Sequence, residues 1–114
     1  MKEVRAYIHS NRVGSVIAAL KDSTAWSVDH NLTAYMVKGS LLPQGEGERH
    51  YSMDLGDEVI NEYKLELHCD DDHVDELVDI IRTVARTGQS NAGWIYVADI
   101  DRAIPIALVT DAGR

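Results

Sequence analysis

Apolar and polar residues alternate along the first segment of the chain, from Lys2 to His9. This period of two predicts a strand with one buried side. From Asn11 to Lys21 the apolar residues recur at helical spacing instead, which predicts a helix. Ser10 or Asn11 is placed to accept the first free backbone N–H groups of that helix.

The same two periods continue through the rest of the chain. Leu32 to Lys38 and Val59 to Cys69 are predicted strands, Asp70 to Thr87 is a second amphipathic helix, and Trp94 to Asp99 is a final strand before an apolar tail, Ile104 to Val109. The predicted order is βαββαβ, which is the ferredoxin-like pattern of the α+β class. In that pattern both helices cover one face of a four-stranded antiparallel sheet.

A long connection, Gly39 to Glu58, joins the two middle strands. A hairpin at this point normally needs only about two to five residues. The glycines and charges of the segment argue for mobility rather than a packed insert. Long loops in compact domains are usually functional, so we expect this one to have a function, the alternative being a disordered tip without one.

The face of the sheet opposite the helices also predicts an assembly. If this face is as apolar as Ala6, Ile8, Tyr96 and Ala98 suggest, it needs cover from another subunit. We therefore expect a homo-oligomer.

Composition narrows the class of protein. The 114 residues fit a single domain, 1–114, and the net charge of −8 argues against nucleic acid as a partner. Cys69 is the only cysteine, and the opening residues contain no apolar signal-peptide core, so we expect a cytoplasmic protein. His9, His30 and His50 lack partners for acid–base chemistry, so we expect them at the surface or in loops.

A glycine-flanked polar loop, Gly88 to Gly93, separates the second helix from the final strand. In the phosphate-binding loops that follow a known rule, the glycines come after a strand and open a helix, which is the reverse order. An anion held here would therefore rest on loop amides and on a nearby Arg or Lys. The alternative is an ordinary helix-to-strand turn with Gly88 at the helix C-cap.

Three segments, YMVKG from Tyr35, YKLELHCDDD from Tyr63 and ARTG from Ala85, combine with the order of elements to resemble the PII signal-transduction family. The resemblance runs from Met1 to about Ile106. It implies a homotrimer that binds an adenine nucleotide in clefts between subunits. It also implies a mobile T-loop, residues 39–58, that signals the bound ligand to a target protein, and it implies no catalysis.

Carried over to this chain, the resemblance implies a nucleotide site built from three segments. The strand residues near the adenine would be Thr33 and Glu66. The first foot of the T-loop would lie beside the phosphates with Val37, Lys38 and Gly39. The amide loop facing the phosphates would contain Arg86, Thr87, Gly88, Gln89, Ser90, Asn91, Ala92 and Gly93. A second ligand would meet Lys38, Gly39, Ser40 and Glu62.

Departures from the family pattern change the second ligand that we expect. Pro43 and Glu62 stand where the resemblance places a glutamine and a lysine that bind 2-oxoglutarate, and the Glu62 carboxylate would repel that dicarboxylic acid. Glu62 could instead pair with Lys38 or Arg49 across the feet of the loop. Leu55 stands where some members carry a uridylylated tyrosine, which leaves no counterpart for that modification.

Other departures concern the nucleotide itself. Trp94, Pro105 and Ala107 stand where the resemblance places three cations for the outer phosphates, so we expect ADP or AMP in preference to ATP. PII-like branches that lack the nitrogen-sensing residues include ones encoded with carboxysome and bicarbonate-transport genes. The chain resembles that branch because it also lacks the nitrogen-sensing residues. This resemblance suggests bicarbonate as a second ligand and a transporter or carbon-metabolism protein as the target.

The segment HCDDDH, His68 to His73, contains residue types that bind metals. It lies where a strand is predicted to end and a helix to begin, and acids at such a junction cap the helix and complement its dipole. We favour the cap, since successive residues there point in different directions. Cys69 would be a buried, inert thiol. The competing hypothesis is a ferredoxin-like metal-binding or metal-tolerance protein that uses His68, Cys69 and the nearby acids.

Overall fold

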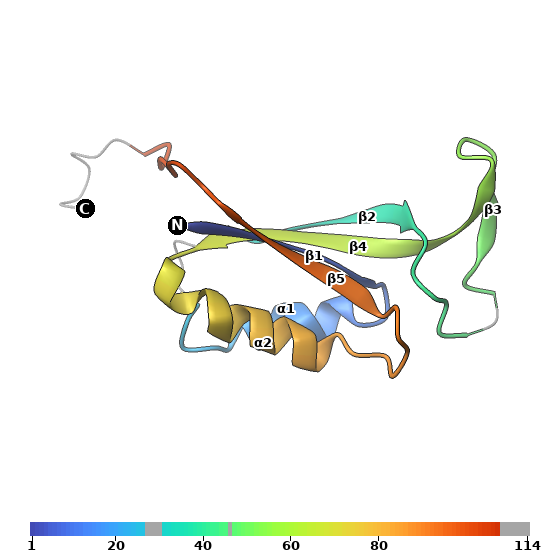
Figure 1. Cartoon of the computed structure of the whole chain (residues 1–114), viewed down its shortest axis with the longest axis horizontal. Coiled ribbons are helices and arrows are strands. Elements are labelled where there is room, and N and C mark those ends of the chain that lie inside the picture. The colour runs from blue at the N-terminus through green and yellow to red at the C-terminus, as the bar shows by residue number, and fades with distance from the viewer. Residues whose placement is uncertain (27–30, 46, 108–114) are drawn as a thin grey trace.

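The computed structural model describes residues 1–26, 31–45 and 47–107. The elements in chain order are β1 (Lys2–His9), α1 (Val13–Lys21), β2 (Thr33–Gly39), β3 (His50–Ser52), β4 (Asp57–Cys69), the 3-10 turn η1 (Asp71–His73), α2 (Val74–Val84) and β5 (Gly93–Asp99). The predicted α+β, ferredoxin-like fold is confirmed. Figure 1 shows both helices on one side of the sheet.

The sheet has the strand order β2-β4-β1-β5, and its neighbouring strands are antiparallel. β1 lies in the centre, because it pairs with β4 on one side and with β5 on the other. The four-stranded prediction omitted β3, a short strand inside the T-loop that pairs with the start of β4, from His50 opposite Val59 to Ser52 opposite Asp57. The second half of the T-loop, from His50 onward, is therefore a hairpin extension of the sheet rather than an unpaired loop.

The hydrophobic core lies between the sheet and the two helices. It contains the alternating apolar residues of β1 and β4 together with one stripe of each helix, namely Val4, Ala6, Ile8, Leu65, Leu67, Cys69, Val16, Leu20, Leu77 and Ile81. The prediction that Ala6 and Ile8 help to make the uncovered face apolar is wrong, since both lie in this core. The other side of β1 has Tyr7, which lies edge-on to Tyr96.

The predicted helix ends need correction. α1 begins at Val13, and neither Ser10 nor Asn11 caps it, because the N-cap position is Arg12 and makes no side-chain capping bond. The second predicted helix divides into η1 and α2, and α2 ends at Val84 rather than Thr87. The C-cap is Ala85, so the alternative that placed Gly88 at that position is wrong.

The strands run slightly further than the alternation indicated. β4 extends upstream to Asp57, since β3 supplies a partner for its first residues.

In the predicted apolar tail, Ile104 and Ile106 are exposed, while Leu108 and Val109 lie outside the described residues, as does His30. None of the described helices is long and apolar enough to cross a membrane.

Candidate functional site

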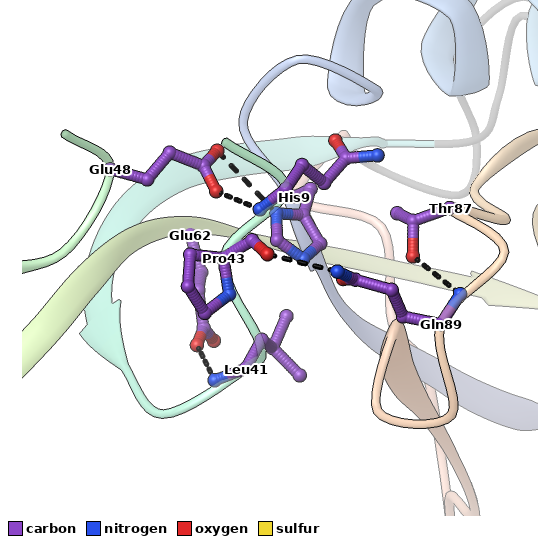
Figure 2. A network of polar contacts seen from close by, with 8 residues as sticks. His9, Leu41, Pro43, Glu48, Glu62, Thr87 and Gln89 are labelled. Carbon is purple, nitrogen blue, oxygen red and sulfur yellow. Dashed lines mark hydrogen bonds and ion pairs between the residues drawn. The ribbon is translucent and has the colours of Figure 1, made fainter. Parts of the chain in front are cut away.

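The glycine loop after α2 lies against the first foot of the T-loop. The Gln89 side-chain amide donates to the Pro43 carbonyl at 3.0 Å, as Figure 2 shows. The Leu42 N–H donates to the Asn91 carbonyl at 3.3 Å, and the Asn91 side chain reaches the Ser40 carbonyl at 3.5 Å. These bonds join two segments that are about fifty residues apart in sequence.

A cleft of about 280 Å³ opens beside this contact. It brings together six of the predicted site residues, which are Val37, Lys38, Gly39, Ser40, Glu62 and Asn91. Its remaining wall is largely aromatic, with Trp94, which the resemblance placed at an outer-phosphate position, and with Tyr7 and Tyr96, which the sequence did not assign to a site. The Trp94 indole N–H donates to the Asn91 side chain at 3.1 Å, so the position expected to carry a cation instead braces the glycine loop.

The other predicted residues of the glycine loop are not all on this cleft. Arg86, Ala92 and Gly93 line a second cleft of about 210 Å³ that Trp94 also borders. The Arg86 guanidinium donates to the Arg82 carbonyl at 3.2 Å. Within the loop, the Thr87 hydroxyl accepts from the Gln89 N–H at 3.3 Å. The loop therefore presents its two sides to two clefts.

Thr33 and Glu66, the residues predicted near the adenine, lie directly opposite each other in the β2–β4 pair. Val37 and Glu62 form another opposed pair four residues further along the same strands, which is about 13 Å away at the usual strand rise. Ser90 and Gly88 lie in the glycine loop, where Gly88 has the positive φ of 85° that glycine tolerates. The adenine and phosphate parts of the prediction thus occupy different ends of one strand pair.

Glu62 is buried, with only 4% of its surface exposed. Its carboxylate accepts the Leu41 N–H at 2.9 Å and so holds the first foot of the T-loop (Figure 2). It also fills the space beside Gly39, where a Cβ would overlap it. Neither of the ion pairs considered for Glu62 forms among the described residues, and the Lys38 ammonium lies 3.1 Å from His50 Nε2 instead.

The middle of the T-loop lies against His9. The sequence predicted a surface residue, but His9 is 0% exposed, because the T-loop folds back over the end of β1. Its Nδ1 lies 3.7 Å from the Glu48 carboxylate, which also accepts the Gln44 backbone N–H (Figure 2). His9 is also the register partner of Glu62, so the contacts to Glu48 and to Leu41 lie at the same end of the β1–β4 pair.

Lys64 provides a positive charge on the sheet face away from the helices. Its ammonium lies 5.4 Å from the Tyr35 ring centroid and 5.6 Å from that of Tyr7. Hydrogen bonding to Tyr35, assisted by Tyr7, raises the pKa of Lys64 above its ordinary value. Lys64 also pairs with Glu66 at 3.5 Å, so a fixed cation lies beside the residue predicted to contact the adenine.

The HCDDDH segment does not assemble a metal site, since no group of three or more potential ligands comes together within the described residues. The predicted burial of the free Cys69 thiol is confirmed, and this burial raises the pKa of the thiol. Asp71 accepts from the N-terminal ammonium at 2.7 Å, and this bond lowers the pKa of Asp71. The predicted side-chain cap is wrong, because Asp70 accepts from His73 only through its backbone carbonyl.

Comparisons with a family model and with individual proteins identify the same family of nitrogen regulatory proteins. The family model of the nitrogen regulatory protein P-II matches residues 1–108. The P-II protein of Nostoc punctiforme is 30% identical over 106 residues, which cover 93% of this chain and 91% of the relative. The P-II protein of Porphyra purpurea is 27% identical over 106 residues with the same coverage. The nitrogen regulatory protein GlnK of Escherichia coli strain K12 is 32% identical over 75 residues, 66% of this chain and 67% of GlnK.

Proposed function

Since this chain belongs to the nitrogen regulatory protein P-II family, we propose that it is a homotrimeric module that binds an adenine nucleotide and signals to a partner protein through its T-loop. The family consists of regulatory proteins, so the chain is a regulatory protein rather than an enzyme. The metal-binding alternative is not favoured. We place the protein in the cytoplasm, without a nucleic-acid partner.

The observation that carries this proposal is the contact between the glycine loop and the first foot of the T-loop. Hydrogen bonds from Gln89 to Pro43 and from Leu42 to Asn91 hold the two segments together beside Lys38. A phosphate on the loop amides would therefore lie near a cation and against the T-loop at once. This geometry supports a loop whose position depends on the bound nucleotide.

The uncovered sheet face supports the proposed assembly. Tyr7 and Tyr35 flank Lys64 there, Tyr96 lies edge-on to Tyr7, and Tyr35 and Tyr96 are exposed in a single chain. An exposed aromatic group of this kind is typical of a surface that another subunit covers. We propose that the neighbouring subunit completes the nucleotide cleft near Thr33 and Glu66.

We expect ADP or AMP to bind at least as tightly as ATP. Trp94 lines the cleft where a cation for the outer phosphates was expected, and Pro105 and Ala107 supply no charge. Calorimetric titration of all three nucleotides with magnesium present tests the proposed function directly. Trp94→Lys should raise the ratio of ATP affinity to AMP affinity roughly tenfold or more, because an added charge-assisted bond is worth about 1.5–3 kcal/mol, whereas loss of the indole bond to Asn91 affects both nucleotides. A clear preference of the unmodified protein for ATP would refute this expectation.

We expect no binding of 2-oxoglutarate, even with saturating nucleotide. The buried carboxylate of Glu62 already occupies the Leu41 N–H and would repel a dicarboxylate. A smaller anion such as bicarbonate is the better candidate for a second ligand, held between Lys38 and the nucleotide phosphates with help from backbone donors. Titration of 2-oxoglutarate into the Mg-ATP complex should give no saturable heat, and saturable heat would contradict the assignment of Glu62. Glu62→Gln, which keeps an acceptor for Leu41, isolates the effect of the charge.

A further inference from the structure

The tip of the T-loop, between β3 and β4, is an ordered turn. The Gly56 N–H donates to the Ser52 carbonyl at 2.8 Å, and the Leu55 N–H reaches the Ser52 hydroxyl at 3.3 Å. Ser52 itself is buried, and Gly56 has the positive φ of 68° that closes the turn. Figure 1 shows this hairpin projecting from the end of the sheet, away from both helices.

Large apolar side chains point into solvent from this ordered turn. Met53 is 87% exposed, and Tyr51 and Leu55 are each 59% exposed. Large apolar side chains exposed together on one short hairpin are a feature of surfaces that bind other proteins. The turn already fixes the backbone that carries these side chains, so docking would order little further chain.

Acidic residues accompany the apolar side chains. Asp54 lies within the turn, and Asp57 and Glu58 follow it at the start of β4. Together with the net charge of −8, these carboxylates repel nucleic acid and anionic membrane surfaces. They favour a protein surface that carries Lys and Arg around an apolar centre.

The groove that a second copy of this chain offers would bind the tip poorly. A groove of about 600 Å³ between α1 and α2 is apolar enough to receive side chains, through Ile80 and Val84. Its rim, however, carries Asp22, Glu76 and Asp79. Like charges would therefore oppose the acids of the tip.

We propose that Tyr51, Met53 and Leu55, here called the tip anchor, dock into an apolar pocket of a partner protein whose rim carries Lys and Arg. This inference rests on the proposed function, because the partner would be the target to which the T-loop signals. It specifies the chemistry of that partner and the side chains that enter it. The acids of the turn would contact the basic rim and orient the hairpin.

The test begins with photo-cross-linking in cells of the source organism. p-Benzoylphenylalanine placed at position 51 replaces one aromatic side chain by another, and mass spectrometry identifies the cross-linked residues. The expected adduct joins a partner at apolar residues flanked by Lys or Arg. An adduct with a second copy of this chain, an adduct at an acidic or wholly polar surface, or no adduct at all would overturn the proposal.

Binding to the purified partner then measures the anchor. Met53→Ser should weaken the complex at least tenfold, while Met36→Ser, a matched change of an exposed methionine on β2, should leave it unchanged. Asp54→Asn should weaken it less and reduce its salt dependence. Equal affinity of Met53→Ser and the unmodified protein, or cosedimentation with phosphatidylglycerol vesicles in place of the partner, would overturn the proposal. Unchanged ADP binding by Met53→Ser separates this outcome from a failure of the proposed nucleotide site.

Discussion

Gly93→Ala is expected to lower the free energy of unfolding by about 3 kcal/mol or more. Gly93 has a φ of 145°, a conformation that residues with a Cβ rarely adopt. A Cβ at this position would overlap the Tyr7 carbonyl oxygen on the neighbouring strand. Because that obstacle is backbone of the central strand β1, relief requires the first residues of β5 to move away from it.

Two other glycines provide matched controls for this substitution. Gly14→Ala, in α1 with nothing within 4 Å, should stabilise the protein by up to about 1 kcal/mol. Gly88→Ala has a positive φ but open space, so it should cost only about 1–2 kcal/mol. Urea denaturation of the variants gives these values. A loss below about 1 kcal/mol for Gly93→Ala would contradict the close approach of β5 to β1.

Lys38→Ala is expected to weaken ADP binding about 10- to 100-fold, since a hydrogen bond to a charged group is worth about 1.5–3 kcal/mol. Lys38 lines the cleft beside the glycine loop, and its ammonium lies beside His50 rather than beside a carboxylate. Its charge is therefore available to a phosphate. The stability of the fold should hardly change, because the side chain is exposed.

The control for this variant is Lys21→Ala, which removes the same charge from the exposed end of α1. It should leave ADP affinity within about twofold of the unmodified protein, because exposed charges beyond roughly 10 Å are largely screened at ordinary salt. Calorimetry in the same buffer compares the two variants. Similar affinities for both would mean that Lys38 does not contact the phosphates.

The strands were predictable because each of β1 and β4 has one face in the core and one outside it. The period of two separates the faces of a strand, and for β1 the apolar face is the one against the helices, which is why Ala6 and Ile8 belong to the core. The start of α1 was less predictable, since Arg12 occupies the N-cap position without a side-chain bond. β3 is three residues long and depends on its pairing with β4, so no local pattern marked it.

The glycine loop could be located from its composition, and both of its flanking glycines, Gly88 and Gly93, have positive φ. Burial of His9 could not be predicted, since it results from Glu48 folding back from a distant part of the chain. The contact of Gln89 with Pro43 likewise depends on tertiary packing rather than on spacing. The expected ligand came from the resemblance to the family. The contact between the glycine loop and the first foot of the T-loop is visible only in the structure.

Amide hydrogen exchange with and without ADP tests the central claim most directly, namely that nucleotide at the foot of the T-loop changes the order of that loop. We expect ADP to slow exchange at Val37 to Ser40, because the bound phosphates would fix the foot against the glycine loop. Bicarbonate should add protection further into residues 39–58, and Lys38→Ala should remove both effects. Identical exchange across residues 39–58 with and without each ligand would contradict the account, because the loop would then not report the nucleotide.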